Sequence, residues 1–240
     1  MDGIRAEAIE RYFADLCADA GRCGLIGFAP VEAVRLLPEQ MTYLQSRLQL
    51  LPASEAVTAV AIGLLYREDE VRAIPASWQA QAGPTDTWND YARAYGELNR
   101  LLNKFAGTLA DELGGVAEPA TMEGWAATVD HVDQYFGHCV SHRAFAEAAQ
   151  LGWRGRHGLI VTPEAGPALR FATVFVPQHI GPHPRHLAGC GDCRACVEVC
   201  PILHKAERYR EACRRRLAAL DLEDEVCGIC VRVCWEQVAG

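Results

Sequence analysis

The chain has 240 residues, of which 50% are hydrophobic and 22% are charged, and its formal net charge is −8. This composition predicts a globular protein with one substantial core and excludes a disordered chain. Neutralising phosphates requires clustered lysine and arginine, so an acidic chain argues against nucleic acids as partners.

The first thirty residues contain neither a basic stretch followed by an apolar run nor a twin-arginine motif. No export signal is therefore predicted. No segment approaches the ~18 consecutive apolar residues of a membrane span. We expect a soluble cytoplasmic protein with no membrane partner.

Helical and extended patterns alternate along the first 180 residues. Apolar residues at helical spacing predict helices over 4–20, 31–50, 88–113 and 141–152. Apolar runs predict a short buried strand at 25–30 and a central strand at 56–66. Residues 158–176 should form a β-hairpin, with its turn near Glu164–Pro167. The expected fold class is α/β (α+β).

A segment rich in proline, glycine and histidine, residues 177–189, separates this region from a cysteine-rich end. Such composition is typical of a junction between domains. We therefore expect a larger domain over residues 1–180 and a small domain over residues 181–240.

Eight of the eleven cysteines fall between Cys190 and Cys234. In a reducing cytoplasm such a group indicates metal binding rather than disulfides. Its first half, "CGDCRACVEVCP", has the spacing C-x2-C-x2-C-x3-C-P, typical of bacterial ferredoxins. Its second half, "CGICVRVC", has the spacing C-x2-C-x3-C, and Cys213 lies between the two halves.

Eight thiolates at four per cluster supply two 4Fe–4S clusters, which would form a short path for electrons. In the first half the fourth cysteine usually ligates the other cluster. The first cluster would therefore take Cys190, Cys193, Cys196 and Cys234, and the second Cys200, Cys213, Cys227 and Cys230. Zinc is the alternative, but zinc knuckles use cysteine pairs separated by a spacer, so the spacing favours clusters.

Four stretches of the chain resemble the epoxyqueuosine reductase family and, more distantly, the reductive dehalogenases. They are "GLIGFAPVEAV", "AVTAVAIGLLY", "HRAFAEAAQLGWRGRHGLIVTPEAG" and the eight-cysteine tail with its isolated Cys213. The combination of the tail with "LGWRGRHGLIV" is much more specific than the cysteine motif alone.

The resemblance implies a nitroreductase-like α/β domain that binds cobalamin, followed by a ferredoxin-like domain with two 4Fe–4S clusters. The clusters would pass single electrons toward the cobalt, and the corrinoid would carry the chemistry. Tyr91, Tyr95, Trp153 and Arg156 are the candidate corrinoid-binding residues; Arg156 stands where the family has a lysine.

The chain also departs from the family pattern. Phe136 stands where the family has its catalytic aspartate, and Gly96 stands where epoxyqueuosine reductases have a histidine. His138 is the candidate replacement acid. The chain ends six residues after Cys234, so we expect a short form without the family's C-terminal helical repeats, and tRNA not to be a partner.

These departures lead to a corrinoid-linked iron–sulfur redox protein, which reduces or handles cobalamin or acts reductively on a small substrate. If it is an enzyme, it would be a cobalamin-dependent iron–sulfur reductase. Expected partners are an electron donor such as ferredoxin or flavodoxin, and a corrinoid-dependent protein. One alternative is an epoxyqueuosine reductase acting on tRNA, and another is a ferredoxin-like carrier whose large domain binds flavin.

Overall fold

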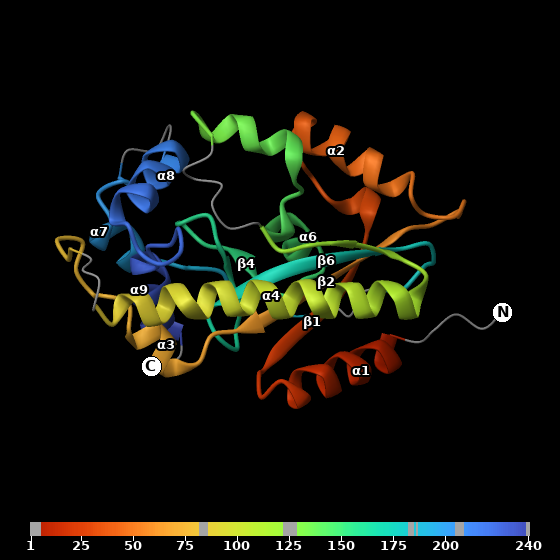
Figure 1. The fold of residues 1–240 in the computed structure, drawn as a ribbon, viewed down its shortest axis with the longest axis horizontal. Helices are drawn as coiled ribbons and strands as arrows, with labels where there is room; N and C mark the ends of the chain where they lie inside the picture. The colour runs from red at the N-terminus through yellow and green to blue at the C-terminus, as the bar shows by residue number, and fades with distance from the viewer. Residues whose placement is uncertain are drawn as a thin grey trace.

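The computed structural model describes residues 6–81, 86–121, 129–181, 185, 187–204 and 209–238. A twisted sheet lies in the middle, with helices on both of its faces and the cysteine-bearing helices at one end (Figure 1). Its strand order is β1-β2-β6-β3, and every neighbouring pair is antiparallel. The strands are β1 (Gly24–Pro30), β2 (Thr58–Leu65), β3 (Val116–Glu118) and β6 (Leu169–Val176).

The predicted central strand is confirmed as β2, which pairs with β1 on one side and β6 on the other. Its side chains alternate between two cores, as the period of two in a strand requires. Val60, Ile62 and Leu64 enter the core that α1 (Ala6–Asp19) and α4 (Trp88–Leu113) cover. The neighbouring alanines face the core covered by α2 (Pro38–Leu48) and α6 (His142–Ala148).

The predicted hairpin over 158–176 is wrong, although its turn is present. The backbones of Thr162 and Gly166 exchange two hydrogen bonds of 2.8 and 2.9 Å. The strands on either side of that turn join different sheets: β5 (Ile160–Val161) pairs with β4 (Trp153–Arg154), and β6 pairs with β2. An eight-residue register with β2 gives β6 far more backbone hydrogen bonds than a partner of two residues could.

The long helix is confirmed as α4, which ends where Gly114 adopts a left-handed φ of +61°. The helix expected over 31–50 is broken instead. A 3-10 turn, η1 (Val31–Ala33), precedes α2, which starts at Pro38. Proline is favoured in the first turn of a helix and disfavours helix in the residue before it.

The cysteine-rich end carries α7 (Ala195–Val199), α8 (Tyr209–Leu220) and α9 (Ile229–Val238), with α7 in contact with α9. Val226, Ile229 and Val231 belong to the same core cluster as Trp88 at the start of α4. The short helix α3 (Glu68–Arg72) contacts α9, and the 3-10 helix η2 (Val132–His138) contacts α8. The C-terminal helices therefore share a core with the sheet and its long helix.

The observed fold is a mixed α/β arrangement around a small antiparallel sheet, as the expected fold class states. The division into domains at residue 180 stays a prediction. Within the described ranges, no helix is long and apolar enough to cross a lipid bilayer.

Candidate functional site

A cavity of about 680 Å³ lies at the end of the sheet where β2 finishes and β6 begins. Its wall combines Tyr66 after β2, Tyr91 and Tyr95 from the start of α4, Leu169 of β6 and residues of the C-terminal helices. This volume falls within the range of sites for small molecules and cofactors. The cavity therefore joins the α/β layers to the cysteine-rich end.

Aromatic rings form one side of the cavity. The rings of Tyr66 and Tyr91 lie 4.9 Å apart, and the guanidinium of Arg170 lies 4.1 Å from the centre of the Tyr95 ring. Arg170 also donates a 3.0 Å hydrogen bond to the side-chain oxygen of Asn99. Burial raises the pKa of Tyr66 and of Tyr91, so both phenols are neutral at ordinary pH. The predicted residues Tyr91 and Tyr95 thus lie in the cavity wall.

Arginines dominate the charge of the cavity. Among its described lining residues, two are acidic, Asp224 and Glu225. Seven are arginines: Arg35, Arg143, Arg154, Arg170, Arg210, Arg214 and Arg216. Arg143 donates a 2.9 Å bond to the carbonyl of Gly158, and burial lowers its pKa. Guanidinium groups in a confined space favour anionic ligands such as phosphates.

Two buried histidines also line the cavity. His142 bonds to Thr173 Oγ1 at 2.9 Å through Nδ1 and to the carbonyl of Pro119 at 2.8 Å through Nε2, so Nε2 carries the proton. His157 accepts a 3.1 Å bond from the amide of Leu159 at Nδ1, and its buried Nε2 makes no hydrogen bond. Burial lowers the pKa of each histidine to about 4, and both are therefore neutral.

Four cysteines line the cavity, and they are the four predicted for the second cluster: Cys200, Cys213, Cys227 and Cys230. The pKa of the Cys213 thiol is raised to about 12, first by burial and then by Cys227 and Cys200. The Cys230 pKa is raised by burial and by the other three thiols. The structure thus brings these sulfurs together; we call them the cavity set.

The other four cysteines form a second group, which we call the outer set: Cys190, Cys193, Cys196 and Cys234. Burial and then the thiols of Cys196, Cys190 and Cys193 raise the pKa of Cys234 to about 12. Cys193 is exposed and Cys190 is half-buried, so the outer set reaches the surface. Cys196 is also among the thiols that raise the pKa of Cys230, so the two sets lie near each other.

All eleven cysteines are free thiols. Burying thiolates is unfavourable unless a cation or metal compensates their charge, so these convergent thiols suit iron–sulfur clusters. Within the described ranges, no three His, Cys, Asp or Glu side chains are placed to hold a single metal ion. The assignment of cluster ligands stays a prediction.

The other predicted site residues lie outside the cavity wall. Trp153 donates from Nε1 to the sulfur of Cys190, and Arg156 donates to the carbonyls of Gly191 and Cys193. Both residues therefore contact the loop of the outer set. His138 is the exposed last residue of η2 and is not among the residues that line the cavity.

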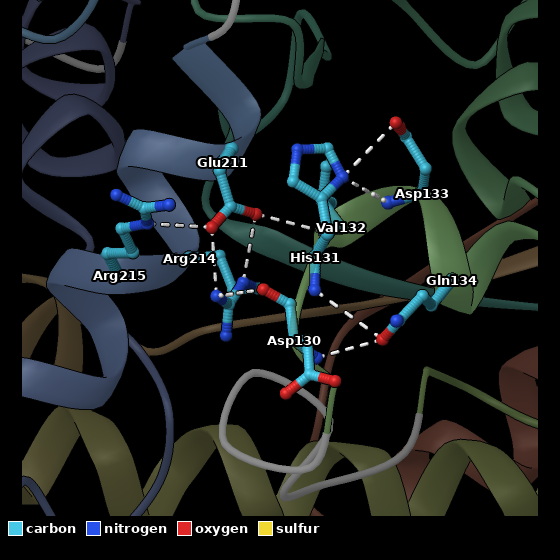
Figure 2. Close-up of polar contacts among 8 residues, drawn as sticks. All are labelled: Asp130, His131, Val132, Asp133, Gln134, Glu211, Arg214 and Arg215. Atoms are coloured by element: carbon cyan, nitrogen blue, oxygen red, sulfur yellow. Dashed lines mark hydrogen bonds and ion pairs between the residues drawn. The ribbon is translucent and has the colours of Figure 1, made fainter.

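Glu211 of α8 binds the start of η2, next to the cavity-lining residues Val132 and Arg214 (Figure 2). Its carboxylate accepts a 2.9 Å bond from the amide of Val132 and bonds from Arg214 and Arg215. These donors hold the pKa of Glu211 well below its usual range. Arg214 also donates to the carbonyl of Asp130. The start of η2 is thereby held beside α8, and its Tyr135 and Phe136 line the cavity.

No family model matches the chain. The epoxyqueuosine reductase of Synechococcus sp. (strain CC9605) is 26% identical over 169 residues, which cover 70% of this chain and 47% of that protein. The structure of epoxyqueuosine reductase from Streptococcus thermophilus has a TM-score of 0.52 and 16% identity, and the match covers 99% of this chain and 67% of that one. An epoxyqueuosine reductase solved with an epoxyqueuosine-modified tRNA stem loop has a TM-score of 0.45, 19% identity and coverages of 87% and 56%.

The fold is thus that of a mixed α/β protein similar to a solved epoxyqueuosine reductase. The resemblance to the epoxyqueuosine reductase family is confirmed, at modest identity, and it implies the use of iron–sulfur clusters. The chain spans about half the length of the curated relatives that match most of it.

Two expectations are wrong. The first is that cobalamin handling is the main role, because the relatives are named as reductases of epoxyqueuosine. The second is that tRNA is not a partner, because the curated relatives that match most of the chain are named epoxyqueuosine reductases. The net charge of −8 conceals an uneven distribution, because the cavity wall is rich in arginine.

The sequence analysis missed several polar residues of the cavity. Arg143 and His157 lie near the two ends of the segment "HRAFAEAAQLGWRGRH", and each stands beside apolar residues. Their position next to apolar helix and strand residues is a signal for buried polar groups. Arg170 gave no such signal, because it lies at the start of a strand, where a charged residue is ordinary.

Proposed function

We propose that this chain is a reductase of the epoxyqueuosine type, which reduces an epoxide carried by a modified tRNA. The observation that carries the proposal is the cavity set: four cysteines that are scattered over thirty-one residues of sequence converge on the wall of an arginine-rich cavity. A redox centre at that wall could deliver electrons directly to a bound anionic substrate. The names of the relatives support epoxyqueuosine as the substrate.

The outer and cavity sets would each hold one 4Fe–4S cluster, with the assignment given by the sequence. The outer set reaches the surface at Cys193, where an electron donor such as ferredoxin or flavodoxin could dock. Electrons would then pass one at a time to the cavity set. Converting an epoxide to an alkene and water consumes two electrons and two protons, so the donor must be oxidised twice for each turnover.

The substrate would be held by guanidinium groups. Arg143, Arg210 and Arg216 line the cavity without an ion-pair partner among the described residues. Arg216 lies over the Trp78 ring at 3.7 Å, and Arg210 lies 5.6 Å from the centre of the Phe136 ring. These stacking contacts leave donors for the phosphates of a tRNA loop. Phe136 stands where the family has its catalytic aspartate, and its ring cannot donate a proton to the substrate.

A corrinoid is the cofactor that the family resemblance implies for this cavity. Tyr66, Tyr91 and Tyr95 supply apolar ring faces and hydroxyl groups that could contact a large planar cofactor. When bound, such a group supplies a strongly reducing metal centre. Titrating reconstituted protein with cob(II)alamin under EPR tests this part, and an unchanged spectrum would remove it.

The test of the function is anaerobic reconstitution of the whole chain, followed by incubation with an epoxyqueuosine-modified tRNA stem loop and a reductant. Mass spectrometry of the digested stem loop should show loss of one oxygen atom. Failure to convert the stem loop, in protein that contains about eight irons per chain and bound cofactor, would reject the proposal.

The cluster assignment has its own test. Replacing Cys234 with alanine should lower the iron content toward about four per chain and remove the outer cluster only. Cys139→Ala is the matched control, because Cys139 is a free, half-buried cysteine outside both sets. Loss of the cavity cluster in the Cys234 variant would show that the crossed assignment is wrong.

A further inference from the structure

The indole of Trp153 donates a hydrogen bond to the sulfur of Cys190, with 3.4 Å between Nε1 and Sγ. Trp153 lies in β4, where it pairs with Val161 of β5. Sulfur is a larger and weaker acceptor than oxygen, so the bond is longer than one to a carbonyl. The donor thus belongs to a paired strand and not to a loose loop.

The same hairpin holds the loop that carries the sulfur. Arg156 donates to the carbonyl of Cys193 at 2.9 Å and to that of Gly191 at 2.8 Å. The amide of Gly155 bonds to the carbonyl of Leu159 at 2.8 Å and closes the hairpin. The position of the indole relative to Cys190 is therefore held by the strand pairing of β4 and by the bonds from Arg156 to the cysteine loop.

We propose that Trp153 sets the reduction potential of the outer iron–sulfur cluster through this hydrogen bond, and that Arg156 is a positioning residue for the loop. The inference rests on the proposed cluster function. Reduction adds one electron from the docked donor to the cluster, and no bond or proton is exchanged. An N–H dipole that points at a ligand sulfur stabilises the extra negative charge, so it raises the potential.

The contact distinguishes the outer set from the cavity set. Within the described part of the chain, Trp153 is the residue whose side chain donates a hydrogen bond to one of the eight sulfurs. The indole of Trp88 donates instead to the backbone carbonyl of Cys227, which belongs to the cavity set. A raised potential at the surface cluster makes it the first acceptor of an incoming electron. The hydrogen bond would thus help to match the outer cluster to its external donor.

The experiment compares Trp153→Phe with wild type after anaerobic reconstitution of the full chain. Phenylalanine keeps an aromatic ring but removes the N–H. In an EPR-monitored redox titration, we expect the midpoint potential of one cluster to become more negative and that of the other to stay unchanged. Trp235→Phe is the matched control, because Trp235 adjoins Cys234 and its ring contacts Arg72, not a sulfur.

An unchanged potential in Trp153→Phe, or an equal shift of both clusters, would overturn the inference. If wild type binds no iron, the proposed function fails instead, so the two failures are distinct. If Trp153→Phe loses its outer cluster, the hydrogen bond can be tested by pulsed EPR on reduced Trp235→Phe protein with 15N-labelled tryptophan. This protein keeps Trp153 and lacks the tryptophan next to Cys234. A 15N coupling from the outer cluster supports the contact, and its absence refutes it.

Discussion

Trp88→Phe tests how firmly the long helix is joined to the cavity set. Trp88 is fully buried at the start of α4, and its Nε1 donates a 2.7 Å hydrogen bond to the carbonyl of Cys227. Phenylalanine fills most of the same space but leaves that buried carbonyl without its indole donor. Losing a partner for a buried polar group costs about 1–3 kcal/mol.

The smaller ring also leaves a gap, which adds about 1 kcal/mol, a fraction of the 3–5 kcal/mol for truncating a buried aromatic residue. We therefore expect Trp88→Phe to lower the free energy of unfolding by about 2–4 kcal/mol. Anaerobic urea denaturation measures it. The control is Trp78→Phe, because the half-buried Trp78 ring under Arg216 makes no indole hydrogen bond to the described residues, so the loss should stay below about 1 kcal/mol. Equal losses in the two variants would refute the reasoning.

Two further predictions concern the buried polar groups. His142 and His157 have pKa values lowered to about 4, so the unfolded chain binds their protons at a higher pH than the folded chain. The free energy of unfolding should be highest above about pH 6.5 and should fall by about 1.4 kcal/mol per pH unit for each histidine down to pH 4. Replacing both histidines with glutamine should make the urea midpoint nearly independent of pH between pH 5 and 7. Glu211→Gln removes the charge that holds η2, so deuterium exchange at the amide of Val132 should accelerate, whereas Glu147→Gln, which breaks an exposed pair, should leave it unchanged.

Local sequence patterns were sufficient to predict the helices and strands whose own residues carry a clear apolar pattern. The helix over 88–113 has a continuous apolar face and a glycine at its end, and the strand over 56–66 is apolar throughout. The hairpin over 158–176 was wrong because strand partners depend on residues far away in the sequence. β6 pairs with a strand more than a hundred residues earlier, and no short-range signal encodes that choice.

The candidate site divides in the same way. Cysteine spacing is a local signal, so it allows two ligand sets to be predicted, and the cavity wall contains the four cysteines of one of them. The cavity arginines come from five separate parts of the chain, so neither a motif nor the total charge reveals them. Trp153 and Arg156 were predicted to bind a corrinoid, whereas their contacts with the cysteine loop could be seen only in the fold.

The shared core of the sheet and the C-terminal helices has a consequence for biosynthesis. Trp88 leaves the ribosome long before Val226, Ile229 and Val231, the residues that complete its surroundings. At ~5–20 residues per second, about 7–30 seconds of translation separate them. During that interval the end of the sheet presents apolar surface, which makes the nascent chain a substrate for chaperones.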